Sequence, residues 1–162
     1  MKKVILTVLE GIAGFFAGFY MGIQRATDKV DKGLIAYEKN QHKSESSVDL
    51  MNIWIKKLHE GKSLAILCKK KKYRNVAIYG MNYMGERVLE ELTAGQINVV
   101  YGVDKAAHKI KSDIKVLEPS ASLEQVDAII VTPISYYEEI KNVLQNKLVC
   151  PILSLEDMIC EL

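Results

Sequence analysis

A buried strand, a glycine turn and an amphipathic helix follow one another in the stretch VAIYGMNYMGERVLEEL, residues 76–92. This order opens dinucleotide-binding folds, in which the glycines allow a tight turn beside the phosphates. Gly80 and Gly85 occupy the first and third glycine positions, and Asn82 replaces the middle glycine. Because asparagine tolerates a left-handed backbone, we expect the turn to survive, although the Asn82 side chain takes space that the phosphates would use.

The rest of the carboxyl-terminal half continues the alternation. We expect further strands at 97–103, 114–118, 127–132 and 151–155, and helices at 83–93, around Leu123, at 135–145 and from Glu156. The runs 76–78 and 128–131 are apolar without alternation, which is typical of strands covered by helices on both faces. The sequence therefore predicts a single Rossmann-like parallel sheet of about five strands, in the order 3-2-1-4-5.

Ligands of such folds bind at the carboxyl ends of the strands, near the switch between the first and fourth strands. Asp104 ends the second strand about twenty residues beyond the glycine loop, where an acid can bind a ribose hydroxyl. Lys105 beside it can accept a 2′-phosphate. The predicted cofactor-binding residues are Gly80, Met81, Asn82, Gly85, Asp104, Lys105, Thr132 and Pro133.

Each of these residues also has a purely structural interpretation. Gly80 and Gly85 can form a turn without a ligand, Asp104 can be a strand-end acid facing water, and Lys105 can be a solvated surface lysine. The sequence leaves both interpretations open.

The amino-terminal segment predicts a membrane anchor. After a tail of residues 1–3, the twenty residues 4–23 are apolar or small apart from Thr7 and Glu10, which is the length of a transmembrane helix. A cleaved signal peptide is the alternative, but no small-residue cleavage site follows. Basic residues after the span favour a single-pass protein of the inner or plasma membrane with a cytoplasmic carboxyl-terminal domain, and a carboxyl-terminal domain outside the cell is the alternative.

Gly14, Gly18 and Gly22 repeat every four residues within this span. This spacing creates a helix face on which a second helix can approach closely, either in a homo-oligomer or with another membrane protein. Residues 24–47 are polar and predict a juxtamembrane linker. Residues 48–72 form a helical lead-in, with Gly61 as a helix end and Ser63 as the N-cap of a short helix, and residues 73–162 form the Rossmann-like domain.

Several functions are disfavoured. The formal net charge is only +2, which does not favour nucleic-acid binding. The three histidines lack metal-ligand spacing, so no metal site is expected, and the three cysteines form no CxxC pair. Tyr137-x-x-x-Lys141 matches the catalytic pair of short-chain dehydrogenases but lies too close to the glycine loop, so we expect no catalytic residues.

The segments VAIYGMNYMGERVLEEL, INVVYGVDK, VDAIIVTPISYYEEIKNVL and PILSLEDMI together resemble the Rossmann domain of bacterial surface-polysaccharide biosynthesis proteins. Related domains precede nucleoside-diphosphate-sugar epimerases or dehydratases and, in another branch, sugar acyltransferases. The resemblance implies that Gly80, Asn82, Gly85 and Asp104 contact NAD(P) or a nucleotide sugar. The chain departs from these families at Asn82 and in having no downstream catalytic domain.

These observations favour a membrane-anchored protein that binds NAD(P) or a nucleotide sugar and has an accessory or sensing role in cell-surface polysaccharide biosynthesis. Two alternatives remain. The chain is an oxidoreductase or sugar-nucleotide-modifying subunit completed by a partner chain, or it is a structural adaptor without a ligand.

Overall fold

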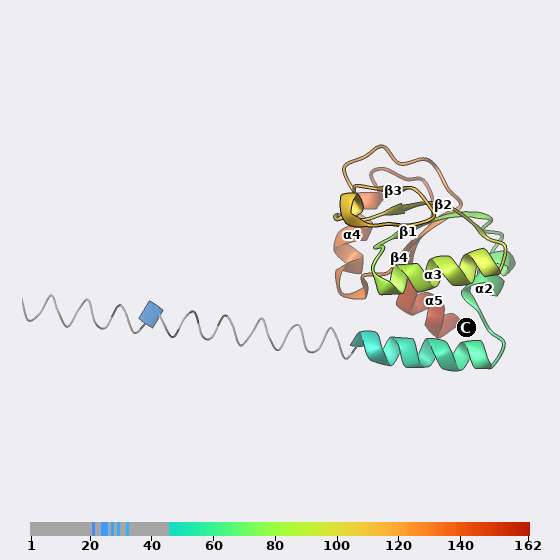
Figure 1. The fold of residues 1–162 in the computed structure, drawn as a ribbon, viewed down its shortest axis with the longest axis horizontal. Helices are drawn as coiled ribbons and strands as arrows, with labels where there is room; N and C mark the ends of the chain where they lie inside the picture. Colours follow the sequence, from blue (N-terminus) through green and yellow to red (C-terminus); the bar gives the residue numbers. More distant parts are fainter. Residues whose placement is uncertain (1–20, 22–23, 26, 28, 30–31, 33–45) are drawn as a thin grey trace, which may run out of the picture. The chain divides into compact units, whose positions relative to one another are not determined.

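The computed structural model describes residues 21, 24–25, 27, 29, 32 and 46–162 (Figure 1). The chain divides into two units, Met1–Ser47 and Val48–Leu162. Among the described residues, none of the helices has the length and apolar character needed to cross a membrane. Apart from Met21, the predicted span 4–23 lies outside the described residues, as do Gly14, Gly18, Gly22 and most of the predicted linker.

The second unit contains a five-stranded parallel sheet in the order β3-β2-β1-β4-β5, which confirms the predicted architecture. Its strands are β1 (Asn75–Tyr79), β2 (Asn98–Val103), β3 (Val116–Leu117), β4 (Ala128–Val131) and β5 (Ile152–Ser154). All of β4 and all but the first residue of β1 are buried, as expected for strands between two helical layers.

Helices cover both faces of this sheet. They are α2 (Leu64–Lys70), α3 (Tyr83–Ala94), α4 (Tyr137–Leu144) and α5 (Leu155–Glu161), with short 3-10 turns η1 (Ala107–Lys109) and η2 (Ile134–Tyr136). Val76 and Ile78 of β1 pack in one apolar cluster with α2, α3 and α5, whereas Ala77 and Tyr79 pack in a second cluster with α4 (Figure 1). Alternate residues of β1 therefore serve two separate cores.

The segment that leads into the domain is helical over residues 46–59, here called the lead-in helix. It ends at Gly61 as predicted: Gly61 has φ of +74°, its N–H donates to Leu58, and the Lys62 N–H donates to Lys57. This pattern is a Schellman motif, which satisfies the last carbonyl groups of the helix. Ser63 then caps α2 as predicted, because its hydroxyl accepts from the Ile66 N–H.

One predicted element is wrong. The residues around Leu123 form no helix, and the chain between β3 and β4 is irregular. Leu123 and Val126 instead pack singly against the core on the α4 face. The Tyr101 hydroxyl donates to the Glu124 carbonyl and ties this segment to β2. Because a loop stands where a crossover helix was expected, α4 is the only helix that packs on this face of the described residues.

Candidate functional site

The turn after β1 is built around two glycines. Gly80 has φ of +93°, and a Cβ atom there would lie 2.6 Å from the Thr132 hydroxyl and 2.7 Å from Pro133. A Cβ atom at Gly85 would overlap the Gly80 carbonyl oxygen. Both positions therefore need glycine for the packing of β1, α3 and the end of β4, independently of any ligand.

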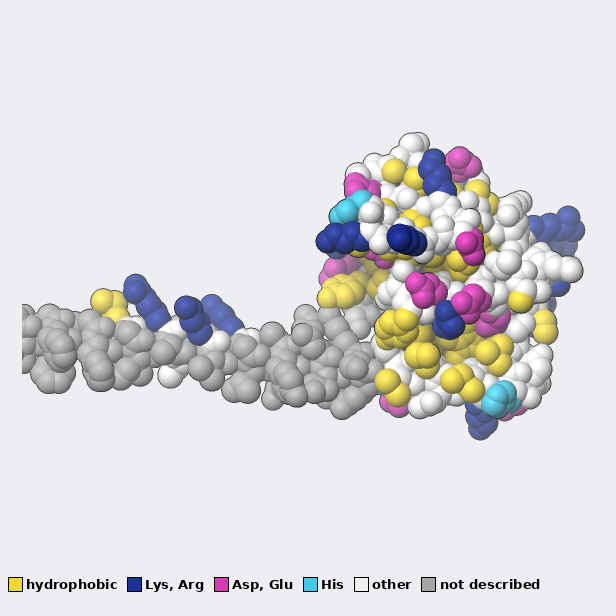
Figure 2. All heavy atoms as spheres, viewed as in Figure 1, with side chains coloured by type: hydrophobic (Ala, Val, Ile, Leu, Met, Phe, Trp, Pro, Cys, Tyr) yellow, Lys and Arg dark blue, Asp and Glu magenta, His cyan; other side chains and the backbone are white. Residues whose placement is uncertain are grey.

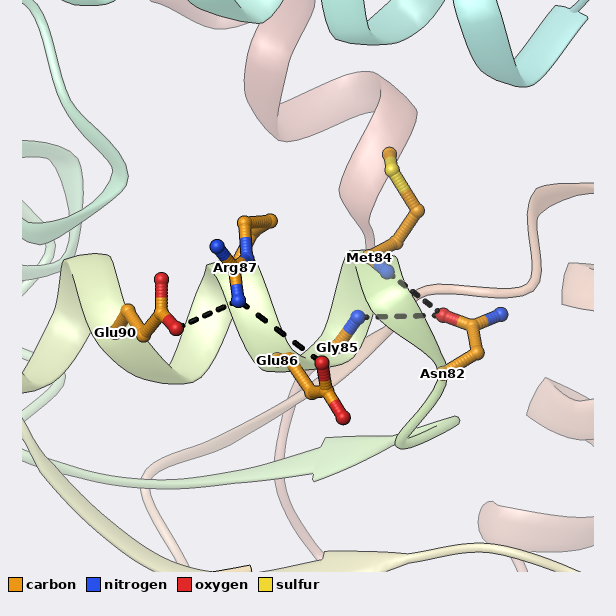
Figure 3. A network of polar contacts seen from close by, with 6 residues as sticks. All are labelled: Asn82, Met84, Gly85, Glu86, Arg87 and Glu90. Carbon is orange, nitrogen blue, oxygen red and sulfur yellow. Dashed lines mark hydrogen bonds and ion pairs between the residues drawn. The ribbon is translucent and has the colours of Figure 1, made fainter.

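Asn82 is the N-cap residue of α3. Its side-chain oxygen accepts hydrogen bonds from the backbone N–H groups of Met84, at 3.0 Å, and Gly85, at 3.3 Å (Figure 3). In dinucleotide-binding folds, amides at this helix start face the pyrophosphate. The residue that replaces the middle glycine thus supplies an oxygen to the amides that a phosphate would otherwise contact.

Asp104 follows β2 and is tied to the same turn. One carboxylate oxygen accepts from the Met81 N–H at 2.9 Å, and the other accepts from the Ala106 N–H at 2.8 Å. The Met81 side chain is buried and lies over Gly102, where a Cβ atom would be 2.7 Å from it. Asp104 therefore holds the glycine loop against β2, a role that its predicted contact with ribose did not include.

Thr132 lies beneath the loop and is almost fully buried. Its hydroxyl donates to the Gly80 carbonyl at 2.7 Å, and its backbone N–H donates to the Tyr79 carbonyl. These bonds join the ends of β1 and β4, so the two strands on either side of the topological switch are held in a fixed position.

A cleft of about 560 Å³ opens at this edge of the sheet. Of the predicted site residues, Gly80, Asp104, Lys105 and Pro133 line it, whereas Met81, Asn82, Gly85 and Thr132 do not. The sequence interpretation missed the other lining residues, which come from β1, the loop after β3, η2 and α4: Tyr79, Pro119, Tyr136, Glu139, Ile140 and Val143.

One sequence signal points to the missed residues. The segment 134–143 immediately follows the fourth strand at its carboxyl end, which is the edge where ligands of this fold bind. Its amphipathic pattern by itself indicates only packing. Val143 is 51% exposed, and its side chain contributes to the cleft wall.

The electrostatic character of the cleft is mixed. Lys105 contributes a positive charge, and Asp104 and Glu139 contribute carboxylates. The pKa of Tyr79 is raised, first by burial and then by the negative charge of Asp104, so its hydroxyl stays protonated near neutral pH. The cleft therefore offers a hydroxyl, a cation and carboxylates around an apolar centre, a composition suited to binding an amphipathic small molecule.

Other candidate groups have structural roles. Tyr137 donates its hydroxyl hydrogen to the Ile152 carbonyl at 2.8 Å, so it joins α4 to β5. Cys150 is half-buried, and burial raises the pKa of its thiol, which disfavours a reactive thiolate. In the described part of the chain, no three histidine, cysteine or acidic side chains come together in a way that could hold a metal ion.

Comparison with known proteins gives one similarity. A family model described as "C2185-like, N-terminal" matches residues 72–150, from just before β1 to just before β5. No curated protein matches the chain, and no solved structure matches it. The matched range includes the glycine loop, Asp104, Lys105 and the part of α4 that lines the cleft, while the description of the family names neither a ligand nor a reaction.

Proposed function

We propose that the chain is a membrane-anchored Rossmann-like protein that binds NAD(P) or a nucleotide sugar in the cleft, with an accessory or sensing role in cell-surface polysaccharide biosynthesis. The observation that carries the proposal is the position of the cleft. It lies at the carboxyl ends of β1, β2 and β4, and its volume falls within the range of small-molecule sites.

The contacts within the loop favour one mode of binding. The Asn82 side chain already accepts hydrogen bonds from the backbone amides at the start of α3. A phosphate of the ligand should therefore bind these amides more weakly than it would in a loop with three glycines. Lys105 lines the cleft and is the cation within it, so we expect a phosphate of the ligand to pair with Lys105. A 2′-phosphate of NADP near the end of β2 fits this position.

The structural adaptor remains a second candidate, and the capping by Asn82 supports it. A loop whose amides are satisfied by its own side chain is stable without any ligand. In that case the cleft is a surface feature, and the function of the domain lies in contacts with other proteins.

A cleft-filling substitution separates the two candidates. We expect fragment 48–162 to fold alone because it contains every residue of both apolar clusters. Its melting temperature is measured with NAD(H), NADP(H) and several UDP-sugars. A ligand at a hundred times its Kd stabilises by about 2.7 kcal/mol, which raises the Tm of a domain of this size by roughly 10 °C. Val143→Trp should abolish that shift by filling the cleft.

Val149→Trp is the matched control, because Val149 is 96% exposed and does not line the cleft. It should leave the ligand-induced shift unchanged, and both variants should melt near the wild type without ligand. If none of these compounds shifts the melting of the wild-type fragment, the binding proposal fails and the adaptor is favoured.

The role of Asn82 is tested by restoring the missing glycine. Asn82→Gly should cost α3 only a few tenths of a kcal/mol, because glycine is an acceptable N-cap. It frees the amides of Met84 and Gly85, so we expect the Kd for NADH, measured by calorimetry, to fall by roughly tenfold through two amide-to-phosphate bonds. The control Asn82→Asp keeps the cap but adds a negative charge, and it should weaken binding. An unchanged Kd in both variants would show that the phosphates lie away from α3.

A further inference from the structure

The lead-in helix carries two rows of apolar side chains, and only one of them is fully buried in the domain. Leu50 and Trp54 are each 4% exposed and belong to the core with α2 and α3. Beside them runs a second row, Val48, Met51, Ile55 and Leu58, here called the stripe. Val48, Ile55 and Leu58 are 55%, 47% and 41% exposed, so about half of the surface of each of these side chains is left uncovered. Surface positions of a helix usually carry polar residues, so a row of half-exposed apolar side chains points to an interface.

The spacing of the stripe identifies the kind of surface that fits it. Its members are separated by three, four and three residues, which is the a and d pattern of a coiled-coil seam. The sequence before it has the same spacing in the same register: Val30, Leu34 and Tyr37 precede Met51, Ile55 and Leu58 by three heptads each. The positions of the same spacing that lie between these two groups in the sequence, Gln41 and Ser44, are polar.

The stripe also forms one wall of a groove. Met51, Trp54, Ile55 and Leu58 line a recess of about 430 Å³ beside α3, and Arg87 and Glu90 stand on its other wall. The side-chain nitrogen of Arg87 lies 2.6 Å from Glu90 (Figure 3). Apolar side chains gather over the lead-in helix and next to α3, with charged side chains along their border (Figure 2). An apolar seam flanked by charges suits a second helix better than a flat lipid surface.

We propose that the stripe is a dimer interface, on which the lead-in helix of a second copy of this chain packs parallel and in register. The second copy is favoured because the same spacing of apolar residues recurs in the sequence that precedes the domain, and two copies of one chain share that pattern. The parallel direction rests on the predicted membrane anchor. Two copies that are anchored in one membrane in the same orientation both run from the membrane toward the domain, so their lead-in helices point the same way.

Disulfide trapping of the full chain in detergent tests this arrangement. Cys150 and Cys160 are first replaced by serine, and Cys68 is kept because it is buried. Val48→Cys and Ile55→Cys each place one thiol at an a position, where the same residue of the partner lies directly opposite. Ile53→Cys is the matched control, since Ile53 is similarly exposed, at 43%, and lies outside the stripe. We expect dimers to form roughly ten times faster or more at positions 48 and 55 than at 53, because pairing raises the effective thiol concentration.

A second variant tests whether the stripe itself causes the association. Ile55→Glu with Leu58→Glu should slow cross-linking of Val48→Cys to the rate of the Ile53→Cys control, while the melting temperature stays close to that of the parent, because both side chains are about half exposed. Equal cross-linking at 48, 53 and 55 would overturn the proposal, and so would selective cross-linking between a Val48→Cys chain and a Leu58→Cys chain, which requires antiparallel helices. Cross-linking that responds to substitutions of Gly14 and Gly18 but not to Ile55→Glu would also overturn it.

Discussion

Replacing Gly85 with alanine is expected to destabilise the domain by roughly 3 kcal/mol or more, the upper range for overpacking a core. The new Cβ atom would overlap the Gly80 carbonyl oxygen and lie 3.0 Å from the Gly80 carbonyl carbon. Both are backbone atoms, so no side-chain rotation relieves the clash. Helix α3 would have to move away from β1, which opens the larger apolar cluster. Urea unfolding of fragment 48–162 measures the loss.

Gly61→Ala is the control for this substitution. Gly61 has φ of +74°, but a Cβ atom added there would meet no other atom within 4 Å, so alanine brings only backbone strain of about 1 kcal/mol. A Gly85→Ala variant as stable as Gly61→Ala would contradict the close packing of α3 on β1. Because the loss at Gly85 is expected with or without a ligand, this position does not distinguish a binding protein from an adaptor, and the cleft variants are needed for that purpose.

Glu91→Ala is expected to cost roughly 2–3 kcal/mol of stability, because it leaves buried donors without partners. The Glu91 carboxylate accepts from the Trp54 indole N–H at 2.7 Å and from the Leu64 N–H at 2.5 Å. It therefore connects the lead-in helix, the start of α2 and α3 through one side chain. Glu91→Gln keeps the size and one acceptor oxygen, so it should lose less. Equal losses in the two variants would show that the hydrogen bonds contribute little.

The same carboxylate should make stability depend on pH. Burial raises the pKa of Glu91 above its usual 4.5, so the folded state binds this proton more tightly than the unfolded state. Its contribution to the free energy of unfolding should therefore rise as the pH falls from the raised pKa toward 4.5. Asp127 has the opposite sign: hydrogen bonds from the Asn75 and Arg74 backbone lower its pKa below 3.8, so its contribution is lost as the pH falls through that lowered value.

A comparison of the wild type with Glu91→Gln isolates the first of these effects, because glutamine does not titrate. Chemical unfolding is measured at neutral pH and near pH 4.5. The free energy of unfolding of the wild type should increase relative to that of Glu91→Gln as the pH falls. If the wild type instead loses stability relative to Glu91→Gln as the pH falls, the folded state favours the ionised carboxylate.

The sheet is predictable from sequence because the residues of its two central strands fit only buried strands. The runs 76–79 and 128–131 are apolar and too short for core helices, and the glycine at 80 requires a turn at that point. The helix predicted around Leu123 is wrong because two apolar residues spaced three apart satisfy a helical pattern, while in the structure each packs separately against the core. Local spacing does not reveal that a loop can deliver the same two contacts.

The site is predictable only in outline. The carboxyl edge of the sheet, Gly80, Asp104, Lys105 and Pro133 follow from strand order and from the position of the loop. The buried orientation of the Met81 side chain does not follow from the sequence, because it depends on the space above Gly102 in β2. The bonds of Asn82 and Asp104 to the loop amides also depend on three-dimensional distances that the motif does not encode. The motif identifies the residues of the loop, and the structure shows that several of them bind one another.

The two outer strands of the sheet are very short, with β3 spanning two residues and β5 three. A sheet edge is the place where backbone groups of one molecule can pair with those of another, and long open edges promote aggregation. Edges this short offer few groups for such pairing. The domain should therefore tolerate high local concentrations without forming intermolecular sheets.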